Sequence, residues 1–233
     1  MRMLVIGSCT GEKDVGNCPY LLKEVDFDES VVLRRRESEF AQWMKPAVSL
    51  YTGRQHTQMM AAVRLLRSTF GQSCCDVAII SAGYGLINES REIAPYDVTF
   101  QQQPKPWIRK KGVALGVPTA VRALISKYGI VFVLLGDDYL LSTNPPLPVE
   151  LNQKFIYFGS PRHRQVRNRD VIIVPSAQQQ ATQFHDGVMT LKGRMFYLLA
   201  VALSREPSAW EQILADKTSA TVLALIEAGQ RNP

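Results

Sequence analysis

The chain has little of what a metal site requires. Its four cysteines, Cys9, Cys18, Cys74 and Cys75, form no C-x-x-C pair, and its three histidines are scattered along 233 residues. Structural zinc sites are built from Cys and His pairs at short, fixed spacings. We therefore expect no metal site and no cofactor.

Long apolar runs are also missing, as are internal repeats, low-complexity tracts and linkers. No segment approaches the about 20 apolar residues of a membrane-spanning helix. The starting segment MRMLVIGSC has too short an apolar run for a signal peptide. We expect a soluble protein in the reducing cytoplasm, without a membrane partner. Residues 1–233 are predicted to form a single domain, since a chain of this length can build one ample core.

Acidic residues are fewer than basic ones. The chain has 27 Lys and Arg against 21 Asp and Glu, which gives a net charge of +6. A basic balance favours polyanionic partners such as nucleic acid, although many basic proteins of this size bind none. The charge therefore raises the prospect of a nucleic-acid or nucleotide-like ligand without deciding it.

Five short runs are apolar throughout, a pattern that is typical of strands buried on both faces. They are residues 3–7, 77–80, 130–136, 155–159 and 171–175. Most are separated by stretches with helical periodicity, such as 54–71, where Met59, Val63 and Leu66 fall on one stripe. The pattern predicts an α/β fold with a mainly parallel sheet flanked by helices. The last part of the chain reads as helical, and we expect a helical C-terminal elaboration over about 188–230.

Small and polar residues follow the predicted strands. Ser8, Cys9, Thr10 and Gly11 come after the first strand, and Ser81 follows the second. In open parallel sheets, ligands bind beyond the carboxyl ends of the strands. A cation such as Lys13 near Cys9 can lower the pKa of the thiol and make it a nucleophile. The alternative is that Cys9 is a small buried hydrophobe, the commoner role at a strand end.

Three segments together resemble the YaaA-like family. They are SCTGEK at the end of the first strand, KPAVSLYTGRQH before a helix, and IISAGYGLINESREIAPYDVTF after the second strand, within residues 1–100. The resemblance implies a nucleic-acid connection, since proteins of that family are associated with DNA binding and protection from oxidative damage. Because a related protein acts on a modified base in DNA, it also implies hydrolysis of a group on such a base.

The same segments supply the candidate site. The catalytic candidates are Cys9, Lys13, Tyr96 and Asp97, and Asp97 needs burial to act as an acid or base. The ligand-binding candidates are Ser8, Thr10, Gly11, Tyr51, Gly53, Arg54, Ser81, Gly83, Tyr84 and Gly85. The alternative for Gly83 and Gly85 is that they only allow a turn from strand to loop, and for Tyr84 that it caps the core.

The segment RHRQVRNR follows the fourth predicted strand and is strongly basic. Its arginines, Arg162, Arg164, Arg167 and Arg169, are the candidates for contacts with nucleic-acid phosphates. Two other basic clusters, 34–36 and 109–111, suit either a solvated face or the same partner.

Two functions remain open at this point. One is a hydrolase or modifying enzyme that acts on a nucleobase or nucleotide, and the other is a non-enzymatic DNA- or RNA-binding protein linked to oxidative stress. The sequence does not indicate the oligomeric state.

Overall fold

The computed structural model describes residues 2–150, 153–160, 171–215 and 218–231, and it has an α/β fold. Its central sheet has the strand order β4-β3-β1-β6-β7-β8. The strands are β1 (Met3–Ser8), β3 (Cys75–Ser81), β4 (Gly85–Asn88), β6 (Ile130–Val133), β7 (Lys154–Gly159) and β8 (Val171–Pro175). All neighbours pair in parallel except β3 and β4, which are antiparallel. The predicted fold class and the five predicted strands are confirmed.

The inner strands are apolar throughout because both faces of the sheet are covered. In the register of β1, Val5 pairs with Val77 of β3 and with Phe132 of β6. All three side chains are buried. A continuous apolar run at the centre of a sheet is stable only where helices exclude water from both sides. The apolar runs of the sequence are therefore explained by the helices that cover both faces of the sheet.

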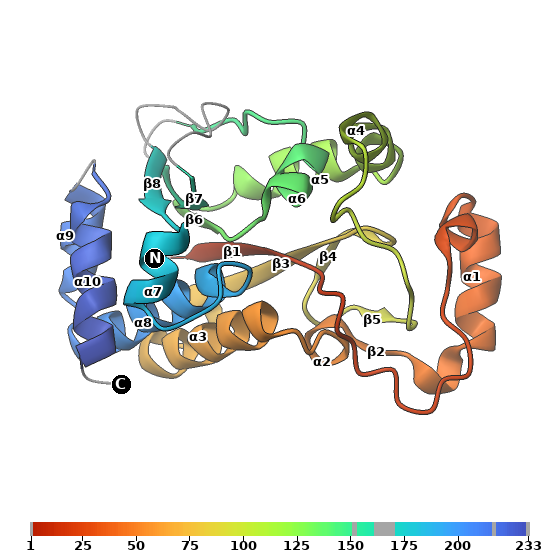
Figure 1. Cartoon of the computed structure of the whole chain (residues 1–233), viewed down its shortest axis with the longest axis horizontal. Helices are drawn as coiled ribbons and strands as arrows, with labels where there is room; N and C mark the ends of the chain where they lie inside the picture. The colour runs from red at the N-terminus through yellow and green to blue at the C-terminus, as the bar shows by residue number, and fades with distance from the viewer. Residues whose placement is uncertain (1, 151–152, 161–170, 216–217, 232–233) are drawn as a thin grey trace.

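Helices cover the two faces of the sheet (Figure 1). The group drawn below the sheet contains α3 (Arg54–Phe70) and α8 (Leu191–Arg205), and α10 (Ala220–Arg231) packs against α8 at the left end. The group above it contains α4 (Lys105–Ala114), α5 (Val117–Ile125) and α6 (Asp137–Ser142). Residues of the expected C-terminal elaboration thus form α8 and α10, together with α9 (Ala209–Ala215), and α8 packs against α3.

Short elements complete the described chain. They are η1 (Glu24–Phe27), α1 (Ser30–Glu39), η2 (Ala41–Trp43), β2 (Lys45–Pro46), α2 (Ala47–Leu50), η3 (Gln72–Cys74), β5 (Glu92–Ile93) and α7 (Gln178–Gln183). The strands β2 and β5 form a small antiparallel sheet of their own. Figure 1 shows α1 at the right end of the molecule, away from the main helical layers. None of the helices in the described ranges combines the length and apolar character needed to cross a membrane.

The strand order creates a switch point beside β1. The chain passes from β1 to β3 on one side and later returns to β6 on the other. The segments that follow β1, β3 and β6 therefore leave the same edge of the sheet next to one another. Ligands of open α/β sheets bind in the crevice at such a point. The residues at this edge therefore form the candidate site.

Candidate functional site at the carboxyl edge of the sheet

Cys9 lies at the switch point, directly after β1. Its backbone N–H donates to the carbonyl of Ile80 in β3, 2.9 Å away. Its Sγ lies 3.0 Å from the hydroxyl oxygen of Tyr139, a residue of α6, which begins four residues after β6. Thr99 Oγ1 is 3.3 Å from the same hydroxyl. The contacts of Cys9 and Tyr139 thus join segments that are far apart in the sequence.

Ser81, Tyr96 and Tyr51 form a buried hydrogen-bond chain beside this thiol. The Tyr96 hydroxyl is 2.8 Å from Ser81 Oγ and 2.9 Å from the Tyr51 hydroxyl. Ser81 Oγ also accepts the N–H groups of Gly83 and Tyr84, at 3.2 and 3.0 Å. A hydroxyl donates one hydrogen bond and accepts two, so Ser81 donates to Tyr96. The next hydrogen bond of the chain joins the hydroxyls of Tyr96 and Tyr51.

The three phenols near Cys9 are kept protonated. Burial raises the pKa values of Tyr51, Tyr96 and Tyr139 well above their usual range, and the charge of the Cys9 thiolate raises them further. A phenol with a raised pKa donates a hydrogen bond or a proton and does not serve as a base near neutral pH. Tyr96 and Tyr139 are therefore suited to donate hydrogen bonds while they stay protonated.

Lys13 is the cation of the cluster. Its ammonium lies 4.5 Å from the centre of the Tyr96 ring, a cation–π contact, and its backbone forms a bridge with Tyr51. Burial lowers the pKa of Lys13, whereas the charges of Cys9 and Asp97 raise it. The thiol and the ammonium are thus close enough to act on each other. A buried lysine whose pKa is lowered can exchange protons more readily than an exposed one.

Gly53 and Gly83 hold the loops around the cluster in close contact. A Cβ at Gly53 would lie 2.7 Å from the Cβ of Thr10, and the N–H of Gly53 donates to Thr10 Oγ1 at 3.3 Å. A Cβ at Gly83 would lie 2.7 Å from the ring of Phe27. These contacts leave no room for a side chain at either position, so both glycines serve the packing of the loops.

Other predicted site residues lie around the cluster. Gly85 has a φ of +72° and ends the turn after β3, whereas Gly11 is exposed. Tyr84 is 8% exposed, and its hydroxyl accepts the N–H of Ala94 at 3.0 Å, so it supports the loop. Ser8 is half-buried at the end of β1. No contact among the described residues joins any of these four residues to the thiol.

Asp97 and Arg54 are exposed and pair with charged residues outside the cluster. The Asp97 carboxylate is 66% exposed and pairs with Lys23 at 2.9 Å. The backbone on either side of Tyr96 pairs with Leu22 like a strand. Successive side chains of an extended segment alternate in direction, so Asp97 faces outward when Tyr96 faces inward. Asp97 therefore lacks the burial that its predicted role requires.

Arg54, the first residue of α3, is 61% exposed and lies 3.4 Å from Asp186. Asp186 also accepts hydrogen bonds from Gln58 and Thr190, at 2.9 and 2.5 Å. The guanidinium thus takes part in a network that ties α3 to the loop before α8.

Two residues of this edge were not among the sequence candidates. Tyr139, in DDYLLS after β6, carries the closest polar contact of Cys9. Lys192 of α8 donates to the carbonyl of Leu135, just beyond β6, and burial lowers its pKa to about 8, opposed by the charge of Asp137. A single lysine within the apolar segment TLKGRMFYLL was the available signal for the second residue.

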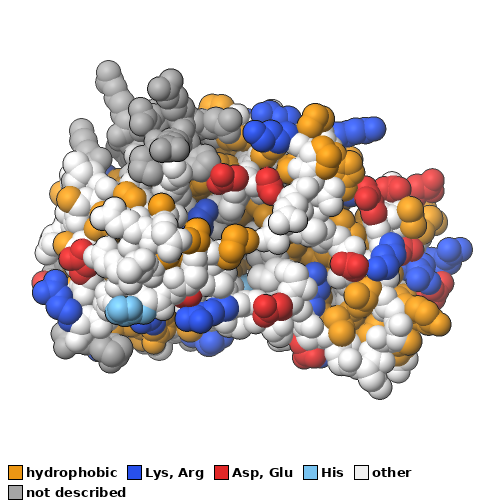
Figure 2. Space-filling model, viewed as in Figure 1, with side chains coloured by type: hydrophobic (Ala, Val, Ile, Leu, Met, Phe, Trp, Pro, Cys, Tyr) orange, Lys and Arg blue, Asp and Glu red, His pale blue; other side chains and the backbone are white. Residues whose placement is uncertain are grey.

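The basic clusters give a mixed outcome. Arg162, Arg164, Arg167 and Arg169 lie outside the described residues. In cluster 34–36, Arg36 pairs with Asp26 at 3.1 Å and with Glu39. Figure 2 shows Lys and Arg interspersed with Asp and Glu at the α1 end of the molecule. This mixing favours a solvated, ion-paired face there over a phosphate-binding one.

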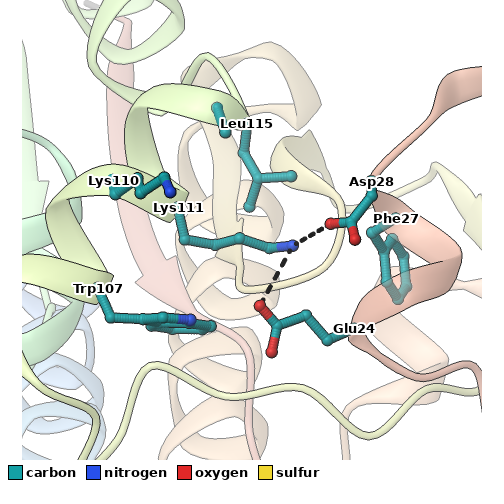
Figure 3. A pocket seen from close by; sticks show the side chains of 8 residues that line it. Glu24, Phe27, Asp28, Trp107, Lys110, Lys111 and Leu115 are labelled. Atoms are coloured by element: carbon teal, nitrogen blue, oxygen red, sulfur yellow. Dashed lines mark hydrogen bonds and ion pairs between the residues drawn. The ribbon is translucent and has the colours of Figure 1, made fainter.

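A hollow of about 250 Å³ lies beside the cluster, between α4 and η1. Figure 3 shows the side chains that line it. They are Glu24, Phe27, Asp28, Trp107, Lys110, Lys111, Ala114 and Leu115. We refer to this space as the α4 hollow.

Two aromatic contacts connect the α4 hollow to the polar cluster. The ring of Phe27 is 5.7 Å from that of Tyr96. Trp107 is 6.0 Å from Phe100, which is 5.3 Å from Tyr139. One aromatic layer therefore separates the hollow from the phenols that surround Cys9.

The site has no grouping typical of a metal centre. Within the part of the chain that the structure describes, no three His, Cys, Asp or Glu residues lie together as ion ligands. The chemistry available at the edge is that of a thiol, an ammonium group and protonated phenols.

Comparisons with known proteins add no family assignment. No protein-family model matches the chain, and no curated protein is significantly similar to it. The YaaA-like resemblance of residues 1–100 therefore stays a prediction.

Proposed function

We propose that this protein is a hydrolase that acts on a nucleobase or nucleotide, with Cys9 as the nucleophile. The observation that carries the proposal is the position of the Cys9 thiol at the switch point, 3.0 Å from Tyr139 and within the electrostatic reach of Lys13. A thiol beside a cation and a proton donor is the usual setting of covalent catalysis by cysteine.

The proposed reaction starts from a thiolate and an ammonium. The Cys9 sulfur attacks an electrophilic carbonyl carbon, a C–S bond forms, and the bond from that carbon to the leaving nitrogen or oxygen breaks. The leaving atom takes a proton from Lys13. Water then attacks the thioester and gives its proton to Lys13, the C–S bond breaks, and the thiolate returns. The sum is the addition of one water across the broken bond.

The phenols serve this reaction as hydrogen-bond donors. The Tyr139 hydroxyl, next to the sulfur, is placed to donate to the negative charge that develops on the substrate oxygen, as does an oxyanion hole. Tyr96 cannot take over the role of a base because burial raises its pKa. Thr10, Lys13 and Thr99 are partly exposed around the buried thiol, so the substrate approaches from that side.

Three observations support a nucleobase or nucleotide as the substrate. The site lies at the position where α/β sheets bind nucleotides, and the α4 hollow beside it has aromatic walls. The basic net charge of +6 favours an anionic ligand. The YaaA-like resemblance, itself a prediction, points to the same class.

The test is turnover by cysteine variants. Nucleosides, nucleotides and short oligonucleotides, including modified bases with amide or ester groups, are incubated with the protein, and products with one added water are detected by mass spectrometry. We expect product with the wild type and with Cys18→Ala, and none with Cys9→Ala. Equal turnover by Cys9→Ala would exclude Cys9 as the nucleophile, and absence of turnover by the wild type on every substrate would overturn the proposal.

A further inference from the structure

The α4 hollow is suited to a small, uncharged ligand. Its volume of about 250 Å³ is below the roughly 300–1,000 Å³ of pockets for drug-sized molecules. Two carboxylates, Glu24 and Asp28, are balanced by two ammonium groups, Lys110 and Lys111. A lining without net charge gives no preference to a strongly charged ligand. The two aromatic side chains, Phe27 and Trp107, favour a planar one.

Lys111 is incompletely paired. Its side chain is 9% exposed, and its Nζ lies 3.3 Å from Asp28 Oδ1 and 3.8 Å from Glu24 Oε1. Strong ammonium–carboxylate contacts measure about 2.7–2.9 Å, and an ammonium has three N–H donors. A nearly buried charge with two long contacts is poorly stabilised. A ligand atom that accepts a hydrogen bond from Lys111 would complete its shell.

Acceptors and an aromatic surface lie next to this donor. Figure 3 shows Lys111 and Trp107 reaching from α4 towards Glu24, which comes from η1. The Glu24 side chain is 48% exposed, so one of its oxygens can accept a hydrogen bond from a ligand. The hollow thus presents one donor and one acceptor side by side, near an indole.

We propose that the α4 hollow binds one unpaired nucleobase through its Watson–Crick edge. The base stacks on Trp107, an acceptor on its edge binds the Lys111 ammonium, and the neighbouring N–H donates to Glu24. Adjacent donor and acceptor groups are what each base presents on that edge. The edge is occupied in a duplex, so the ligand is a free nucleotide or a single strand. The inference rests on the nucleobase preference in the proposed function, and it adds how the base is read.

Calorimetric titration of the full chain with inosine and 1-methylinosine tests the inference. The methyl group removes the N–H of the edge and leaves the ring and the carbonyl. We expect 1-methylinosine to bind at least about tenfold more weakly than inosine, since the Glu24 carboxylate loses the N–H that donates to it and meets a methyl group instead. Equal binding of the two nucleosides, or no binding of inosine, would overturn the proposal.

Variants of the lining give a second, independent measurement. Lys111→Met and Glu24→Ala should each weaken inosine binding about tenfold or more. Lys105→Met, on the same helix but outside the lining, should leave it within about twofold. In Glu24→Ala the Lys111 ammonium keeps its contact with Asp28, so weaker binding in this variant does not arise from an unpaired buried charge that disturbs folding. Unchanged affinity in Glu24→Ala and Lys111→Met would contradict the assignment.

Two further arms separate the ligand sources and the two proposals. A single-stranded oligonucleotide should bind, and its duplex should bind at least about tenfold more weakly. Cys9→Ala should bind inosine like the wild type. If inosine binds to the wild type and Cys9→Ala still turns over substrate, Cys9 is not the nucleophile and the proposed hydrolysis fails, whereas the base subsite is supported. If no nucleoside binds while turnover depends on Cys9, only the subsite fails.

Discussion

Replacing Tyr96 with Phe tests the hydrogen-bond chain at the carboxyl edge. The change removes one oxygen, which bonds to Ser81 at 2.8 Å and to Tyr51 at 2.9 Å. Both partners are buried, with 0% and 1% of their surface exposed. Leaving buried hydroxyls without their partner costs about 1–3 kcal/mol. We expect Tyr96→Phe to lower the free energy of unfolding by that amount in urea denaturation followed by circular dichroism.

A control and a double variant sharpen the measurement. Tyr20→Phe, at a side chain that is 73% exposed, should change stability by less than about 0.5 kcal/mol. The double variant Tyr51→Phe/Tyr96→Phe should cost less than the sum of the single changes, because either one removes their shared bond. A Tyr96→Phe loss below about 0.5 kcal/mol, or strictly additive effects, would refute the proposed chain.

Three other predictions concern titration and packing. Burial lowers the pKa of Lys192 to about 8, so the unfolded chain binds the proton more tightly than the folded chain does. The free energy of unfolding of the wild type should therefore rise relative to that of Lys192→Met as the pH increases from about 8 to 10. A pH-independent difference in urea midpoints would contradict this. Burial lowers the pKa of His56 to about 4, so stability should fall as the pH drops from 6.5 to 4. This fall in stability should be smaller in His56→Gln than in the control His185→Gln, because His185 is exposed. Equal slopes of stability against pH in the two variants would contradict the prediction. Gly53→Ala should lower the free energy of unfolding by about 1–3 kcal/mol through overpacking. Gly11→Ala, where an added Cβ would have nothing within 4 Å, should lower it by less than about 0.5 kcal/mol. Equal losses of stability in thermal melts of the two variants would exclude the packing role of Gly53.

The sheet and its carboxyl edge could be predicted from the sequence. Strands buried on both faces leave continuous apolar runs, and the polar residues that follow them must lie at one edge when the strands are parallel. This reasoning brought Cys9, Ser81 and Lys13 into one candidate site, and the structure has Ser81 and Lys13 in contact with Tyr96. Predicting this edge requires only that the strands are parallel, and not the order of the strands in the sheet.

Long-range contacts and side-chain directions could not be predicted in the same way. Tyr139 lies 130 residues from Cys9, and only the placement of β6 beside β1 brings them together. Asp97 follows Tyr96 directly, but the extended backbone turns the two side chains to opposite sides. The basic run 109–111 looks uniform, yet the helix directs Lys111 inward, where it pairs with Asp28. Charge and residue type alone do not carry this directional information.

The most direct test of the account is the search for a covalent intermediate on Cys9. Protein that is turning over a substrate is quenched in acid, and its peptides are mapped by mass spectrometry. We predict that the acyl part of the substrate is attached to the peptide containing Cys9, and that the adduct is lost in Cys9→Ala and retained in Cys18→Ala. Turnover without an adduct on Cys9, or an adduct on Cys18, Cys74 or Cys75 instead, would contradict the central claim.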